Sequence, residues 1–267
     1  GVVIAIIAGL VIIGGVKRIS TFASALVPLM ALIYIVSALI IVILNFNLIP
    51  DAFNIIFDHA FNGTAATGGF AGATVLMAIR FGIARGVFSN EAGLGSAPIA
   101  HAAAKTNNPP RQGAIAMLGT FFDTIIICSL TALVIIISGS WMSGENGVAL
   151  TSNAFVFGLP NIGDSIVTIC LILFSFTTII GWSYYGERCA QYIFGAKIIT
   201  PYRILWLLSI VLGAYALNLG GQASDSISLI WLVADVMNGF MALPNLIALV
   251  LLSPVIFKIS KEYFSGK

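Results

Sequence analysis

Polar residues interrupt an otherwise apolar run at residues 86–101, which read GVFSNEAGLGSAPIAH. Ser89, His101 and Glu91 are a nucleophile, a base and an acid, the residue types that a hydrolase combines. On a helix that begins at Glu91, however, His101 lies about 15 Å further along, so these side chains do not assemble into a catalytic site. Their placement favours binding over catalysis, and we do not expect an enzyme.

Ionisable side chains occur in the same apolar surroundings. Arg80 and Arg85 precede the polar stretch, and Asp123 lies in the later run FFDTIIICSLTALVIIISG. Charged groups at membrane depth are costly, so they usually face protein or water and mark a path or a partner. Glu91 could pair with Arg85 or stabilise a helix N-terminus. Asp123 could be a gate, the partner of either arginine, or a carboxyl that only accepts hydrogen bonds.

Two adjacent hydroxyls, Thr177 and Thr178, stand in the apolar segment CLILFSFTTIIGWSYYGERC. One of them is the type of hard oxygen ligand that Na⁺ needs. Alternatively, both only bond the carbonyl one turn back, as membrane threonines often do. Trp182 follows Thr178 by one turn and shares its helix face, either beside a pocket or in an interfacial aromatic belt.

Composition indicates that these residues lie in a membrane protein. Of the 267 residues, 59% are hydrophobic and 8% are charged, whereas a soluble domain has about a quarter charged residues. The mean hydropathy is +1.06. The net charge of +2, without a basic block, gives no indication of nucleic-acid binding. Three cysteines without C-x-x-C spacing indicate neither a disulfide framework nor a zinc site.

Apolar runs divide the chain, taken as a single transmembrane domain, into crossings of about 20 residues or more. The expected spans are 1–16, 22–45, 68–104, 113–139, 162–195, 203–219 and 225–257. MNGFMALPN interrupts the last, which we expect to be one crossing, broken or kinked near 238–245. Lys and Arg concentrate in alternate connections, and the other connections carry only acidic charges. This asymmetry predicts a multi-pass protein with a cytoplasmic C-terminus.

The third span is too long for one regular helix. A helix over 68–104 would extend about 55 Å, nearly twice the thickness of the hydrocarbon core. Glycines weaken it, and Ser89, Asn90 and Glu91 suit the start of a new helix. We therefore expect a break near 85–91, with GVFSN unwound and a second half-helix from Glu91 to Lys105. Unwound backbone at membrane depth lines a cavity or is packed by protein, and it forms the binding site of many transporters.

Four strings carry a family resemblance: RGVFSNEAGLGSAPIAHAAAKT, NPPRQGAIAMLGTFFDT, GWSYYGERC and ALPNLIALVLLSP. Together they resemble the sodium:alanine symporter family, also called alanine or glycine:cation symporters. The resemblance implies an all-α, leucine-transporter-like fold of two inverted repeats. It also implies that this chain is a C-terminal portion, with the end of the first repeat and all of the second. The broken helix would open that second repeat.

The resemblance also implies site residues. Phe88, Ser89 and Asn90 would contact a small neutral amino acid, and Trp182 would form a wall of its pocket. Thr177 and Thr178 would offer oxygens to Na⁺, with Thr178 also beside the substrate.

The expected function is sodium-coupled symport of alanine or glycine across the cytoplasmic membrane by alternating access. Na⁺ is the coupling ion, no other cofactor is expected, and the partners are the amino acid, sodium and membrane lipid. The first alternative is a proton-coupled amino-acid transporter. An ion channel ranks below it and is considered because unwound backbone also builds the selectivity filters of channels.

Overall fold

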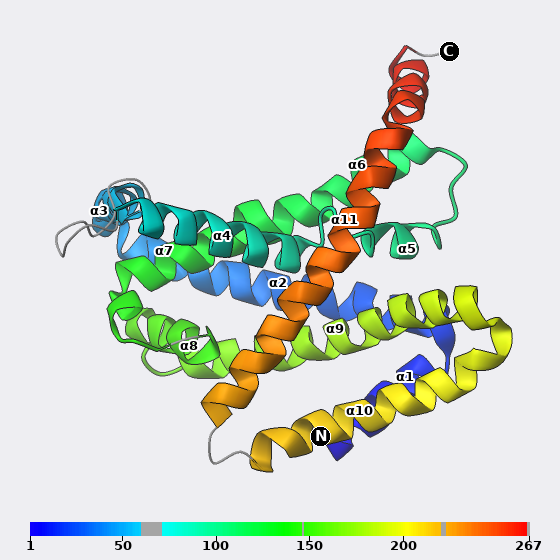
Figure 1. Ribbon diagram of the computed structural model, residues 1–267. Coiled ribbons are helices and arrows are strands. Elements are labelled where there is room, and N and C mark those ends of the chain that lie inside the picture. The colour runs from blue at the N-terminus through cyan, green and yellow to red at the C-terminus, as the bar shows by residue number, and fades with distance from the viewer. Residues whose placement is uncertain (60–70, 146, 220–222, 266–267) are drawn as a thin grey trace. The chain divides into compact units, whose positions relative to one another are not determined.

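The computed structural model describes residues 1–59, 71–145, 147–219 and 223–265, and these residues are helical without any strand (Figure 1). The all-α class is therefore confirmed. The α-helices are α1 (Val2–Ile12), α2 (Gly15–Leu44), α3 (Ile49–Phe57), α4 (Ala71–Asn90), α5 (Ala97–His101), α6 (Pro109–Thr120), α7 (Ser129–Ile137), α8 (Gly147–Gly158), α9 (Gly163–Phe194), α10 (Ile199–Leu219) and α11 (Ala223–Phe264). A π-helix, η4 (Phe121–Cys128), joins α6 to α7. Short 3₁₀ turns are η1 (Phe46–Leu48), η5 (Ser140–Met142) and η6 (Ala196–Ile198).

Five helices among the described residues are long and apolar enough to cross a membrane. They are Gly15–Leu44, Pro109–Ile137, Gly163–Phe194, Ala196–Tyr215 and Leu232–Phe264. The expected spans at 1–16 and 68–104 correspond to α1, which has 11 residues, and α4, which has 20. These two helices are not among the five, so their crossings stay predictions.

The chain forms two compact units. The first unit comprises Gly1–Pro28, Glu91–Ala116 and Leu173–Lys267, and the second comprises Leu29–Asn90 and Met117–Ile172.

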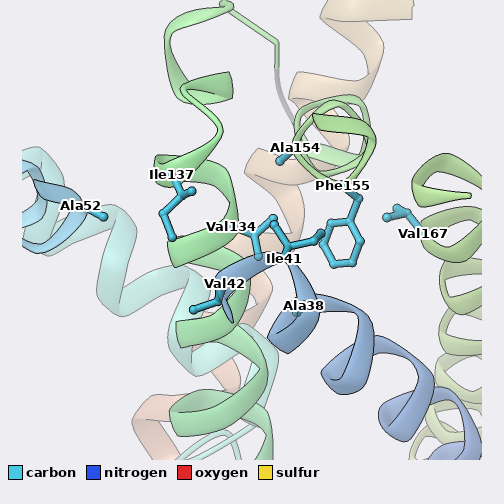
Figure 2. Close-up of a cluster of buried hydrophobic side chains, with 9 residues drawn as sticks. All are labelled: Ala38, Ile41, Val42, Ala52, Val134, Ile137, Ala154, Phe155 and Val167. Carbon is cyan, nitrogen blue, oxygen red and sulfur yellow. The ribbon is translucent and has the colours of Figure 1, made fainter. Parts of the chain in front are cut away.

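The second unit is built around one buried apolar cluster. Its residues come from α2, α3, α7, α8 and the start of α9, and they are Ala38, Ile41, Val42, Ala52, Val134, Ile137, Ala154, Phe155 and Val167. Figure 2 shows the ring of Phe155 pointing toward Ile41. Gly158 lets α8 approach α2, because a Cβ there would meet the Ile41 side chain at 2.5 Å. The hydroxyls of Tyr34 and Thr131, 2.6 Å apart, add a polar link between α2 and α7.

The first unit packs α1 along α10, as Figure 1 shows, with α9 against both. Val11, Ile12 and Ile180 are fully or almost fully buried in this contact. At its end, Arg203 donates to Glu187 at 2.6 Å and to the Ile13 carbonyl at 3.2 Å. Glu187 is 4% exposed, so this ion pair joins α9, α10 and the end of α1 inside protein.

The last crossing differs from its expected form. α11 is one helix from Ala223 to Phe264, with Pro244 inside it, and Figure 1 shows it uninterrupted. No break interrupts α11 near 238–245, and the alternative of a kink there stays a prediction. A proline removes one backbone donor, but opening the helix in apolar surroundings would leave several backbone groups unpaired, so the helix continues through it.

Candidate functional site

The end of α4 carries the residues expected to bind substrate, and it is helical where we expected unwound chain. Residues 86–90, GVFSN, complete α4, and the chain leaves the helix at Glu91. Glu91 has a φ of 55°, and Gly93 and Gly95 have φ values of 85° and 86°. The left-handed backbone therefore begins at Glu91, which is not a glycine, and recurs at Gly93 and Gly95, where glycine permits it. The chain does break here, but the break begins at Glu91, after the segment GVFSN that we expected to be unwound.

Ser89 and Asn90 bind side chains of η4 instead of capping a new helix. The Ser89 hydroxyl lies 2.9 Å from both carboxylate oxygens of Asp123. The Thr124 hydroxyl donates to the same carboxylate at 3.3 Å, and the Asn90 amide donates to Thr124 at 2.9 Å. We call these four residues the α4–η4 cluster. Asp123 is thus a hydrogen-bonded carboxyl, and its roles as a gate or as the partner of an arginine stay predictions.

The π-helix explains how Asp123 and Thr124 come to share these partners. It widens the helix over Phe121–Cys128, within the long apolar helix Pro109–Ile137. Widened turns of this kind are frequent at functional sites, because they redirect side chains relative to a regular helix. Sequence reasoning missed η4. Its only signal is the pair of polar residues in an apolar run, and that pair does not reveal the turn geometry.

The α4–η4 cluster is rich in oxygen. A carboxylate, two hydroxyls and the Asn90 amide oxygen are the ligand types that hard cations prefer. Asp123 and Thr124 are half-buried and Ser89 is exposed, so the cluster is open to a ligand. Phe88 and Arg85 lie on the same last turns of α4 and are also half-buried. Chemically, this cluster could hold a monovalent cation or a proton.

The unwound segment Glu91–Ser96 is held by side chains of the first unit. The Glu91 carboxylate accepts a hydrogen bond from the Ser96 hydroxyl at 2.7 Å, and the Tyr185 side chain lies near it. The Asn245 amide donates to the Gly93 carbonyl at 2.9 Å, and Ser96 is fully buried. Sequence reasoning missed Tyr185 and Asn245. A lone asparagine in the apolar run ALPNLIALV was the available signal.

The second half-helix is shorter than expected. α5 covers only Ala97–His101 and begins after Ser96, so Glu91 is not in its first turn. The predicted role of Glu91 at a helix N-terminus is therefore wrong, because its carboxylate closes the turn before the helix. His101 ends α5 and bonds Gln112 at 2.8 Å.

The expected sodium and pocket residues lie on α9, in the first unit. The Thr177 hydroxyl donates to the Phe174 carbonyl at 2.9 Å, and a backbone bond of this kind was the alternative to sodium binding. The lone pairs of the hydroxyl oxygen remain available. Thr178 is exposed. Trp182 and Tyr185 form an edge-to-face pair, with ring centroids 5.9 Å apart. The roles of these residues in binding stay predictions.

The predicted site residues therefore divide between the units. Phe88, Ser89, Asn90 and Asp123 belong to the second unit, where the last three bind one another directly or through Thr124. A separate set, Glu91, Thr177, Thr178 and Trp182, belongs to the first unit.

Comparison with known proteins decides the family. The family model of the sodium:alanine symporter family matches residues 1–267. The chain belongs to this family. With five long apolar helices, this sodium:alanine symporter family member is a multi-pass membrane protein.

Relatives of this family member have transport names. An uncharacterized transporter of Haemophilus influenzae is 48% identical, over 98% of this chain and 56% of the relative. The sodium/alanine symporter AgcS of Methanococcus maripaludis is 45% identical, over 98% of this chain and 56% of the relative. The probable sodium/glutamine symporter GlnT of Bacillus subtilis is 37% identical, over 100% of this chain and 54% of the relative. The chain spans about half the length of the curated relatives it matches.

Proposed function

We propose that this chain, within the complete protein, serves sodium-coupled symport of a small neutral amino acid, alanine or glycine, across the cytoplasmic membrane. The α4–η4 cluster is the observation that carries this proposal. A carboxylate in an apolar helix is costly unless a cation or proton offsets its charge. Asp123, Ser89 and Thr124 present oxygens to such a cation within one unit. The names of AgcS and GlnT, which couple sodium to an amino acid, support the same function.

In this proposal, the unwound segment forms part of the substrate site. Glu91–Ser96 interrupts the helical chain between α4 and α5, and its carbonyls can hold an ammonium group. By the family resemblance, Phe88, Ser89 and Asn90 would contact the substrate, Trp182 would form a pocket wall, and Thr177 and Thr178 would offer oxygens to Na⁺. The two half-helices would open the second of two inverted repeats, and one bundle rocking against the other would give alternating access.

The primary experiment measures uptake of labelled alanine by the complete protein in liposomes, with and without an inward sodium gradient. We expect the gradient to drive accumulation. Unlabelled alanine inside should accelerate exchange, as a carrier does and a pore does not. Uptake that ignores sodium would contradict the coupling, and exchange without acceleration would contradict a carrier.

The Asp123→Asn variant tests the cluster directly. Removing the charge should raise the sodium concentration for half-maximal uptake by about tenfold or more, since a charge-assisted contact contributes about 1.5–3 kcal/mol. Asp164→Asn is the matched control, because Asp164 also accepts a hydrogen bond from a serine, Ser152, but starts α9. An unchanged sodium requirement in Asp123→Asn would remove the cluster from the coupling site.

Proton coupling is the second candidate. It is favoured by the Ser89 hydroxyl, which is equidistant from both oxygens of Asp123 and can bond the protonated or the ionised carboxyl. Uptake driven by an inward proton gradient in sodium-free buffer would support it, and sodium-dependent uptake insensitive to that gradient would exclude it.

A further inference from the structure

A cavity of about 640 Å³ with two lysines in its lining lies within the first unit. The start of α2, the segment from α5 to α6, and α9 line it, and all of its lining residues belong to that unit. Its polar side chains include Lys17, Thr21, His101, Lys105, Gln112 and Tyr185. The lysines lie in connections that the charge asymmetry assigns to the cytoplasmic side.

The charge around this cavity is positive. Lys17 and Lys105 line it, and none of the described residues that line it is acidic. One carboxylate, that of Glu91, lies near Tyr185 of the lining. A further cation, Arg188, lies 4.9 Å from the centre of the Tyr184 ring, although Arg188 also pairs with Glu187. Two lysines therefore face this cavity against one nearby carboxylate, so the cavity suits an anionic ligand.

His101 adds a directed donor. The Gln112 amide lies 2.8 Å from Nδ1 of His101 and donates to it, so the proton of the neutral ring is on Nε2. An imidazole N–H and two ammonium groups can together contact several oxygens of one phosphate group.

An apolar cavity adjoins the basic one. Its volume is about 490 Å³, and it shares His101, Ala104 and Gln112 with the first cavity. The rest of its lining is mostly small and apolar, including Pro98, Pro109 and Ala116. The hydrogen-bonded pair His101–Gln112 therefore stands between a basic space and an apolar one. A ligand with an anionic end and an apolar end would match both.

We propose that these two cavities bind an anionic phospholipid of the cytoplasmic leaflet. The phosphate lies in the basic cavity, between Lys17, Lys105 and His101, and the beginning of an acyl chain lies against Pro98 and Ala116. Basic pockets between helices on the cytoplasmic side hold phospholipid headgroups in this way. This site is independent of the proposed transport function, because none of these residues is in the α4–η4 cluster.

The test is a binding titration on the complete, delipidated protein in neutral detergent, followed by native mass spectrometry. Phosphatidylglycerol is the probe, with phosphatidylcholine and inorganic phosphate as comparisons. In Lys17→Gln/Lys105→Gln, phosphatidylglycerol affinity should fall about fivefold for each lysine. Lys258→Gln/Lys261→Gln is the matched control, because both lysines are on α11 and line neither cavity. Equal losses in the two double variants, or none in the first, would overturn the proposal.

A second pair of variants tests the apolar cavity. Ala116→Leu fills it and should weaken phosphatidylglycerol binding, whereas Ala114→Leu on the same helix lines neither cavity and should not. Phosphatidylcholine binding as tightly as phosphatidylglycerol would contradict an anion site. Inorganic phosphate that binds with the same lysine dependence, while Ala116→Leu leaves phosphatidylglycerol unaffected, would identify a soluble phosphate site and overturn the lipid assignment.

Discussion

Thr178 has two proposed roles that differ clearly. Its hydroxyl could bond only the backbone of its own helix, or it could offer an oxygen to Na⁺. It is exposed on α9, next to Thr177, whose hydroxyl is directed to the Phe174 carbonyl. Asp123, in contrast, is already surrounded by donors in the structure. The exposed Thr178 hydroxyl and the hydrogen-bonded Asp123 carboxylate would therefore contribute differently to the binding of a cation. The hydroxyl can complete a coordination shell, and the carboxylate supplies the negative charge.

Thr178→Val keeps the shape of the side chain and removes its hydroxyl. We expect a weaker sodium dependence of alanine uptake with the fold intact, as measured by the sodium concentration for half-maximal uptake. Thr168→Val is the control, because Thr168 is another exposed threonine of α9. An unchanged sodium dependence in Thr178→Val would exclude Thr178 from the site.

At the scale of elements, the segment Glu91–Ser96 is a connection with a defined conformation. Tyr185 of α9 lies near Glu91, and the Asn245 amide of α11 donates to the Gly93 carbonyl. Gly95 brings the backbone close to α11, because a Cβ there would lie 3.2 Å from the Asn245 Cβ. The segment is therefore packed by protein, which is the condition for unwound backbone in a membrane.

Gly95→Ala should destabilise the protein by about 1–2 kcal/mol, because alanine is strained at a φ of 86° and would press on Asn245. Gly82→Ala is the matched control, since Gly82 is inside α4 and nothing lies within 4 Å of its Cβ position. That substitution should leave stability unchanged or raise it. Thermal unfolding of both variants in detergent measures the difference, and equal melting temperatures would contradict the defined turn.

On the scale of the whole molecule, each unit has its own means of cohesion. The second unit relies on the apolar cluster around Phe155, and the first combines the α1–α10 contact with the buried pair of Glu187 and Arg203. Many other large apolar side chains are exposed, as Phe157 is at 51%. Such side chains suit a lipid environment, so cohesion depends on the few buried contacts.

Phe155→Ala should lower the free energy of unfolding by about 3–5 kcal/mol, because it leaves a cavity in the core of the second unit. Phe157→Ala, two residues along the same helix, should have little effect because its ring is exposed. Thermal unfolding in detergent compares the two variants. A similar loss in both would show that burial in the cluster does not determine stability.

Several features were accessible from the sequence because they depend on summed or local properties. Hydropathy predicted several long apolar helices, since each needs only its own length of apolar residues, and the structure has five among the described residues. The excess length of 68–104 and its glycines predicted a break, because no regular helix of that length matches the bilayer. The four quoted strings led to the family that the comparison establishes.

Other features were decided only by tertiary structure. The sequence allowed the break to lie at GVFSN or after it, and side-chain bonds to η4 extended α4 to Asn90. The bond from Asn245 to the Gly93 carbonyl likewise depends on a neighbour distant in the chain. By itself the sequence determined the membrane environment, the helical class and the family, because these follow from apolar content and short motifs. Which oxygen faces which donor was left to the packing of helices, because a hydrogen bond between segments depends on geometry that no single segment contains.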